Sequence, residues 1–145
     1  MALAVVTGAS RGLGFENAKS LAALGYDIVM IAKDSNRLSQ AQESLQQSHP
    51  NQQFISYVVD LEDMQATRIA VAKISQQYSA PELLILAHGV MSNKMSKTLK
   101  TNDEEWRRVM AINLDSVFTL VNGLAPAMVE ARSGRIIIYL SLIHI

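Results

Sequence analysis

The sequence of 145 residues has no cysteine, few aromatic residues and no excess of charge of either sign. Without cysteine the chain forms neither a disulfide framework nor a thiolate metal site, and its three histidines, at 49, 88 and 144, are too scattered to suggest another metal site. Thirteen basic side chains balance 13 acidic ones, so we expect no basic face for nucleic acid and no polybasic segment for an anionic membrane.

Long apolar runs are also absent, since none approaches the ~18 residues that a membrane span needs. The N-terminus leads from Met1 straight into apolar residues, without the charged region and cleavage site of a signal peptide. These features predict a cytoplasmic protein with no membrane span. Hydrophobic residues make up 49% of the chain and charged residues 18%, which predicts one folded domain with a proper core.

Short apolar stretches alternate with helical ones along the whole chain. Strands are predicted at residues 2–6, 27–32, 54–59, 83–87 and 135–139, and helices at 13–24, 35–47, 62–78 and from 101 onward. Because parallel neighbours need long crossovers, this alternation predicts an α/β fold with a parallel sheet covered by helices on both faces.

The last predicted helix has a start signal and a stop signal. Thr101-Asn102-Asp103-Glu104 is a capping box, in which the threonine hydroxyl and the glutamate carboxylate would bond the first backbone N–H groups. Pro126 would end or kink the helix near its C-terminal part. Apolar residues at helical spacing predict a core-facing stripe of Trp106, Val109, Met110, Val117, Leu120, Val121 and Leu124.

Three glycines lie between the first strand and the first helix, in the run from Thr7 to Gly14. Free N–H groups at a helix N-terminus and the close backbone approach that glycine allows suit this turn to the pyrophosphate of a dinucleotide. A Walker A loop is excluded, because Gly12 is followed by Leu13-Gly14 rather than by Lys and Ser or Thr. The alternative is a plain glycine-rich turn.

Charged residues follow the second and third strands, where ligands of such a sheet bind. Lys33 and Arg11 offer two cations for a 2′-phosphate, which favours NADP(H) over NAD(H), and the alternative for both is solvated surface charge. Asp60 is a candidate acceptor for an adenine amino group or a cap for the next helix, and both roles can hold together.

Two further polar residues stand out in the second half of the chain. His88 precedes Gly89 after the fourth strand, and because it has no partner in the sequence we favour a structural role over one as an acid or base. Asn113 would point along the buried stripe of its helix, where an amide needs hydrogen bonds. It is either a structural amide bonded to backbone or marks a kink or water site near the chemistry.

Residues spread along the chain form one set: Thr7-Gly8-x-x-x-Gly12-x-Gly14, Asp60, Gly89 and Asn113-Leu114. This set resembles the short-chain dehydrogenase/reductase family of the classical type, over Met1 to about Tyr139. The resemblance implies a Rossmann-type doubly wound sheet in three layers, truncated here after its fifth strand. It also implies an NADP(H)-dependent oxidoreductase that transfers hydride between nicotinamide and a carbonyl or alcohol carbon of a small molecule.

The resemblance also implies roles for single residues. Asn113 would belong to a catalytic set of Asn, Ser, Tyr and Lys, with Ser141 as the serine, at the family's offset of seven residues after Gly134. Asp60 would contact adenine, and the whole protein would be a homodimer or homotetramer. The residues expected around the cofactor are Thr7, Gly8, Ser10, Arg11, Gly12, Leu13, Gly14, Lys33, Asp60, Leu61, Ala87, His88 and Gly89.

The sequence departs from the family pattern in two places. The family usually has Asn-Asn-Ala-Gly after the fourth strand, where this chain has Leu86-Ala87-His88-Gly89. The family's Tyr-x-x-x-Lys, in which the lysine lowers the tyrosine pKa for proton transfer, does not occur in the 145 residues. We therefore expect this chain alone to be inactive.

The last six residues, Leu140 to Ile145, match the translation of CTG TCT CTT ATA CAC ATC, the end of a widely used transposon-based sequencing adapter. We expect residues 1–139 to be the NAD(P)-binding, N-terminal part of a longer domain and residues 140–145 to be a sequencing artefact. On this interpretation Ser141 matches the family serine by coincidence.

Two other functions stay open from the sequence. One is a nucleotide-binding or regulatory module without chemistry, because no proton donor of the family's type is present. The other is a methyltransferase that uses S-adenosylmethionine on a similar sheet. The glycine spacing argues against it, as does Lys33, which stands where an acidic residue would hold ribose hydroxyls.

Overall fold

The computed structural model describes residues 2–92 and 98–140. At its centre is one parallel sheet in the order β3-β2-β1-β4-β5. The strands are β1 (Leu3–Thr7), β2 (Asp27–Ala32), β3 (Phe54–Val58), β4 (Leu83–Leu86) and β5 (Arg135–Ile138). The chain builds outward from β1 to β3 and then returns to β4 on the other side of β1. This doubly wound, Rossmann-type order confirms the predicted fold and places a switch point between β1 and β4.

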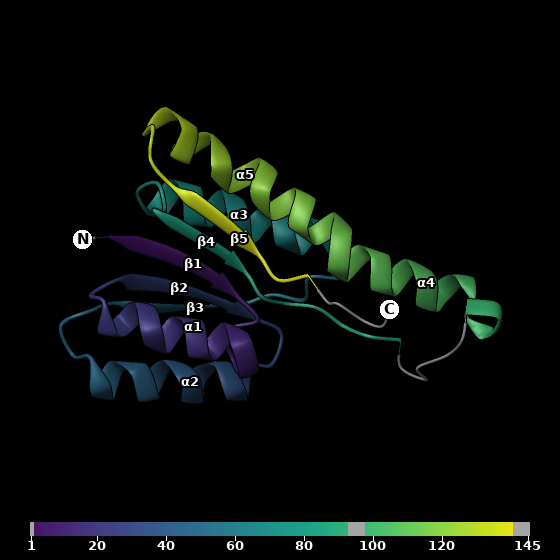
Figure 1. Cartoon of the computed structure of the whole chain (residues 1–145), viewed down its shortest axis with the longest axis horizontal. Helices are drawn as coiled ribbons and strands as arrows, with labels where there is room; N and C mark the ends of the chain where they lie inside the picture. The colour runs from purple at the N-terminus through teal and green to yellow at the C-terminus, as the bar shows by residue number, and fades with distance from the viewer. Residues whose placement is uncertain (1, 93–97, 141–145) are drawn as a thin grey trace.

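Helices cover both faces of the sheet, which gives three layers (Figure 1). The helices α1 (Gly12–Ala23) and α2 (Ser35–Ser48) lie on one face, and α3 (Met64–Gln77) and α5 (Ser116–Glu130) lie on the other. The first pair packs Ala18, Leu21 and Leu38 against the sheet, in one core cluster. The second pair contributes a second cluster, so the sheet separates two cores.

The strands supply both cores because successive side chains of a strand point to opposite faces. In β1, Ala4 and Val6 belong to the core under α1 and α2, whereas Leu3 and Val5 belong to the core under α3 and α5. All four are buried. A strand covered on both faces reads as a continuous apolar run, which is why the central strands were evident in the sequence.

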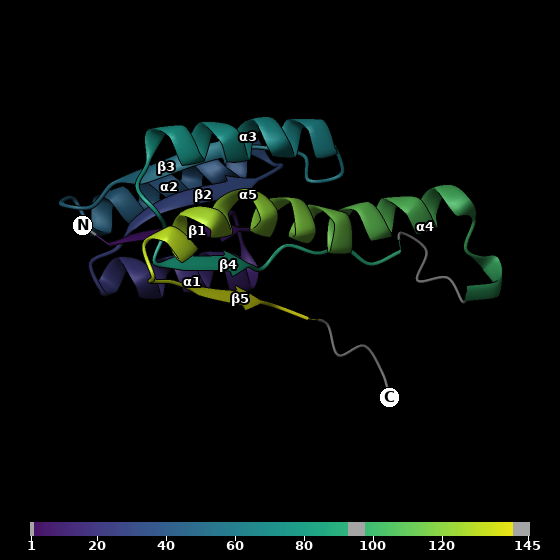
Figure 2. The same cartoon turned by 90° about the horizontal axis from the view of Figure 1, so that it is seen from above.

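A long helix made of three segments extends beyond the carboxyl ends of the strands (Figures 1 and 2). After a 3-10 turn (Thr98–Lys100) come α4 (Asp103–Met110), a π turn that we call η2 (Ala111–Asp115), and α5. The capping box was predicted one residue too early. Asn102 is the cap, and its Oδ1 accepts a hydrogen bond from Glu105 N at 2.9 Å.

For this helix, one further expectation is wrong and one of the two alternatives for Pro126 is excluded. Trp106 is 58% exposed instead of core-facing, because α4 lies past the sheet and none of its residues is buried. Pro126 does not end the helix, which continues to Glu130. Proline removes one backbone hydrogen bond and its ring crowds the carbonyl four residues earlier, a cost that the packing of α5 on the sheet offsets.

The helix Asp103–Glu130 is long and apolar enough to cross a membrane by length and composition, although the sequence analysis predicted no such span. This property is weak evidence, because a helix that packs in a protein core meets the same criterion. Leu120, Leu124 and Met128 of this helix pack on the sheet, in the core under α3 and α5.

Candidate cofactor site

The glycine turn follows the central strand β1 and lies beside the end of β4. Gly8 and Gly12 have φ angles of +64° and +57°, a region that residues with a Cβ rarely adopt. A Cβ on Gly14 would lie 2.3 Å from Gly8 O, and a Cβ on Gly8 would lie 2.8 Å from Ala87 O. The glycines therefore let α1 and the end of β4 approach the turn more closely than any other residue would.

The N-terminus of α1 has no side-chain cap, unlike those of the next three helices. Arg11 is the N-cap residue, and its side chain bonds none of the first N–H groups. By contrast, Asp34, Asp63 and Asn102 cap α2, α3 and α4 by accepting from backbone N–H groups. A Cβ on Gly12 would meet nothing within 4 Å, so the surface of the turn is open there.

An external anion fits this uncapped start. The first N–H groups of a helix point outward and carry about half a positive charge together. Because no side chain of the turn satisfies them, a phosphate group of a bound dinucleotide would be a suitable acceptor. The residues present therefore fit a pyrophosphate at the switch point of the sheet, as the glycine spacing predicted.

Lys33 and Asp60, which follow β2 and β3, form an ion pair with each other. The hydrogen bond to Asp60 raises the pKa of Lys33 above its usual value. Partial burial raises the pKa of Asp60, but the hydrogen bonds from Lys33 and from the Glu62 backbone outweigh it, so this pKa lies below its usual value. Both side chains are therefore charged at neutral pH, and each partly neutralises the other.

The alternative role of Asp60 as a helix cap is wrong. Asp63 caps α3, because its Oδ1 accepts from the N–H groups of Gln65 and Ala66 at 2.9 Å. Asp60 Oδ1 instead accepts from Glu62 N at 3.1 Å, which shapes the turn before the helix. Asp60 is thus held by its neighbours at the carboxyl edge of the sheet, where ligands of this fold bind.

His88 lies between the end of β1 and the π turn. Its Nδ1 atom is 2.6 Å from Thr7 Oγ1, and its Nε2 atom is 2.7 Å from Ser116 Oγ and 3.1 Å from Ile112 O. Burial lowers the pKa of His88 to about 4, against a smaller opposite effect of the hydrogen bond to Ile112. The ring is therefore neutral at pH 7, and both nitrogens are engaged inside the protein, which supports a structural role.

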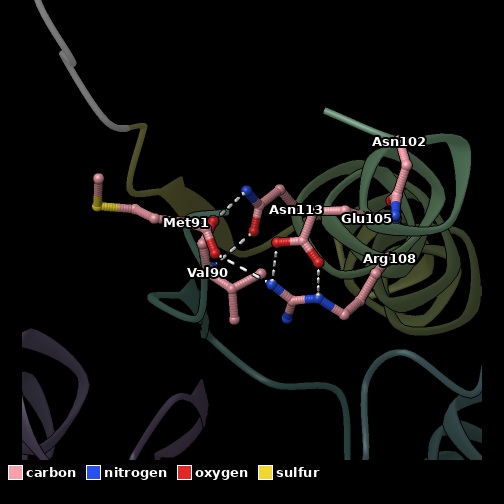
Figure 3. A network of polar contacts seen from close by, with 6 residues as sticks. All are labelled: Val90, Met91, Asn102, Glu105, Arg108 and Asn113. Carbon is pink, nitrogen blue, oxygen red and sulfur yellow. Dashed lines mark hydrogen bonds and ion pairs between the residues drawn. The ribbon is translucent and has the colours of Figure 1, made fainter. Parts of the chain in front are cut away.

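Asn113 is exposed, so the expectation that it points along the buried stripe is wrong. It lies in the π turn, where the extra residue in the turn shifts the helical spacing on which the expectation rested. Its Oδ1 accepts from Val90 N and its Nδ2 donates to Val90 O, both at 2.8 Å (Figure 3). Asn113 is thus an amide bonded to backbone, as the first alternative predicted, and it lies in an irregular turn of the helix.

A second side chain of the long helix, Arg108, bonds the backbone next to Val90, and the sequence did not predict this contact. Arg108 bonds both carboxylate oxygens of Glu105, and its guanidinium also donates to Met91 O at 3.1 Å (Figure 3). Val90 and Met91, which follow β4, are therefore bonded by Asn113 and Arg108 of the long helix. The spacing of Glu105 and Arg108 by three residues signalled their ion pair, but nothing local signalled Met91 as its target.

The remaining predicted site residues lie at the same edge of the sheet or around the glycine turn. Ala87 N donates to Thr7 Oγ1 at 3.1 Å, which joins the ends of β4 and β1. A Cβ on Gly89 would lie 3.5 Å from Asn113 Oδ1. Leu61 is buried in the core under α3 and α5. Leu13 is 61% exposed at the start of α1, three residues after the half-buried Ser10. Ser141 lies outside the described residues.

The same arrangement identifies the family. The family model for short chain dehydrogenases matches residues 2–144. The chain belongs to the short chain dehydrogenase family. The match agrees with the resemblance seen in the sequence, and it includes the glycine turn, the ends of β2 to β4 and the long helix.

Curated short chain dehydrogenases cover almost the whole chain. The 3-oxoacyl-[acyl-carrier-protein] reductase FabG of Escherichia coli is 30% identical over 135 residues, which are 93% of this chain and 52% of the relative. Dehydrogenase/reductase SDR family member 7B of Mus musculus is 34% identical over 139 residues, 94% of this chain and 42% of the relative. The chain spans about half the length of the curated relatives it matches.

Solved structures of the family resemble this chain closely. A metagenomic short-chain oxidoreductase in complex with NADP has a TM-score of 0.89 at 29% identity, over 97% of this chain and 62% of that one. L-sorbose reductase from Gluconobacter frateurii, complexed with NADPH and L-sorbose, has a TM-score of 0.89 at 26% identity, over 97% of this chain and 52% of that one.

Proposed function

We propose that this chain is the cofactor-binding part of an NADP(H)-dependent oxidoreductase that transfers a hydride between nicotinamide and a carbonyl or alcohol carbon. The observation that carries the proposal is the uncapped start of α1 behind a glycine turn at the switch point of the sheet. Membership of the short chain dehydrogenase family supports it, as do family structures solved with NADP or NADPH.

In this proposal each part of the edge holds a different part of the dinucleotide. The N–H groups at residues 12–14 would bind the pyrophosphate, helped by the turn of Thr7, Gly8 and Ser10. Asp60 and Leu61 would lie against the adenine, and Arg11 and Lys33 against a 2′-phosphate. The backbone from Ala87 to Gly89 would line the nicotinamide half of the site.

The bound nicotinamide would supply the hydride, and the chain's own residues orient the reacting groups. Asn113 would keep its place at the π turn through the two bonds to Val90, which positions the backbone after β4. It would belong to the family's catalytic set together with Ser141. The residues described here thus bind and orient, and we expect no turnover from this chain alone. We further propose a small carbonyl or alcohol compound as the substrate and a homodimer or homotetramer as the assembly.

The two cations proposed for the 2′-phosphate differ in their surroundings. Lys33 is already paired with Asp60, whereas no ion pair of Arg11 is found within residues 2–92 and 98–140. A phosphate at Lys33 must therefore compete with a carboxylate, and a phosphate at Arg11 meets no such competitor. Arg11 is accordingly expected to contribute more than Lys33 to a preference for NADP(H).

The test is a comparison of NADPH and NADH binding by Arg11→Ala and Lys33→Ala in the intact protein, followed by nicotinamide fluorescence. A hydrogen bond to a charged group suggests that Arg11→Ala weakens NADPH binding by about tenfold to a hundredfold, with little change for NADH. Lys33→Ala should give a smaller selective loss. Lys19→Ala is the matched control, since it removes a charge further along α1, where Lys19 pairs with Glu16. Equal losses for the two dinucleotides would rule out the 2′-phosphate assignment.

A further inference from the structure

His88 is the residue at which this chain departs most visibly from the family pattern. The family usually has Asn-Asn-Ala-Gly after the fourth strand, and His88 stands at the place of the alanine. An imidazole is much larger than a methyl group and brings two nitrogens that need partners when buried. Here the partners come from β1 on one side and from the π turn on the other.

The partners and distances around His88 favour one tautomer of the ring. Thr7 Oγ1 accepts from Ala87 N, and its own proton has two acceptors in reach, Ile85 O at 3.5 Å and His88 Nδ1 at 2.6 Å. The much shorter distance favours donation to Nδ1. A carbonyl oxygen only accepts, so the contact of 3.1 Å between Nε2 and Ile112 O requires a proton on Nε2. The network is therefore satisfied by a neutral ring that is protonated at Nε2 and accepts at Nδ1.

The π turn changes the hydrogen bonds of the Ile112 carbonyl. In an α-helix it would accept from the N–H of Ser116, four residues later. In this structure that N–H donates to Ala111 O, five residues back. Ile112 O instead accepts from the Ser116 hydroxyl at 2.6 Å and from His88 Nε2. The histidine and the serine thus both bond the carbonyl from which the π turn diverts the Ser116 N–H.

The residue after Ile112 is Asn113, whose amide holds both polar backbone groups of Val90. A path of hydrogen bonds therefore runs from Thr7, at the start of the glycine turn, through His88 to Ile112, and the peptide bond from Ile112 leads to Asn113. The path joins the two ends of the candidate cofactor site across the switch point between β1 and β4.

We propose that His88 is a positioning residue, which as a neutral Nε2-protonated ring stabilises the π turn and so holds Asn113 in register with the glycine turn. The proposal rests on the proposed function only for its consequence in catalysis. The role of His88 at the π turn does not depend on a cofactor, so this proposal and the proposed oxidoreductase function can be refuted separately.

The first test is the tautomer of His88 in the intact protein without cofactor, read from the ¹⁵N resonances of labelled histidine at pH 7. The proposal requires a protonated Nε2 and an unprotonated Nδ1. A proton on Nδ1, or on both nitrogens, would overturn it, because Ile112 O would then lose its donor or Thr7 its acceptor.

The second test uses hydrogen exchange at Val90 N–H, which Asn113 protects. In His88→Gln, the side-chain amide extends as far from the backbone as Nε2 and can still donate to Ile112 O. In His88→Asn, the amide extends only as far as Nδ1, so Ile112 O loses the donor that the ring supplied. We expect the glutamine variant to exchange like wild type and the asparagine variant to exchange about tenfold faster, the effect of one lost hydrogen bond. The Val29 amide, in β2, is the internal control and should be unchanged in both variants.

Equal acceleration in the two variants, or none in either, would refute a role through Ile112. If the asparagine variant does not fold, His88→Met replaces it, because methionine has the length of glutamine but no N–H to donate to Ile112 O. Faster exchange at Val90 in that variant supports the proposal, and unchanged exchange contradicts it.

Discussion

Acidification should destabilise this protein through His88 in particular. The pKa of His88 is lowered by burial to about 4 in the folded chain, from an ordinary value of 6.5. As the pH falls below 6.5 the unfolded chain therefore binds the proton first, and the folded state loses stability until the folded pKa is reached. The ring contacts Thr7, Ser116 and the Ile112 carbonyl, which are all neutral, so these partners do not offset the charge.

The size of the effect follows from the difference between the two pKa values. Each unit of pKa difference corresponds to about 1.4 kcal/mol, so the full penalty below pH 4 is about 3 kcal/mol. Between pH 7 and pH 5 the folded state should lose about 2 kcal/mol of it. This stability is fully present above pH 6.5 and is lost as the pH falls. A histidine that gains an acidic partner on folding would show the opposite pH dependence.

The assay is urea unfolding of the intact protein at pH 7, 6 and 5, for wild type and for His88→Gln. Carboxylates titrate in both proteins, so the loss caused by His88 is the difference between their losses, which should be about 2 kcal/mol between pH 7 and pH 5. His49→Gln, at the end of α2, is the control and should behave as wild type. If wild type and His88→Gln lose the same stability over this range, burial of a neutral ring is not the cause.

Two further substitutions test other parts of the structure. Gly14→Ala should destabilise the fold by about 1–3 kcal/mol and weaken NADPH binding, because its Cβ would lie 2.3 Å from Gly8 O. An unchanged melting temperature and an unchanged NADPH dissociation constant would contradict the close packing of α1 on the glycine turn. Asn102→Ala should destabilise α4 by about 1 kcal/mol and speed hydrogen exchange at Glu105 N–H, whereas Asn102→Asp should keep the cap. Equal hydrogen exchange in the two variants would show that Asn102 is not the capping residue.

Much of the fold was predictable because its signals are local. Strands covered on both faces are continuous apolar runs, and Gly25 follows α1 closely, with a φ angle of +90°. The long helix was harder, because its π turn breaks the period of 3.6 residues from which buried faces are inferred. This one irregularity, together with the extension of α4 past the sheet, explains the errors at Asn113 and Trp106.

The site divides in the same way. The sequence determined by itself the glycine turn, the absence of a side-chain cap on α1 and the residue types at the strand ends, since each depends on neighbours within a few residues. Only the tertiary structure decided which of these residues meet. Lys33 pairs with Asp60 because β2 and β3 are neighbours in the sheet, and His88 reaches Thr7 because β4 returns beside β1. Such contacts join residues up to 81 positions apart, and the order of the strands, which no local spacing encodes, brings them together.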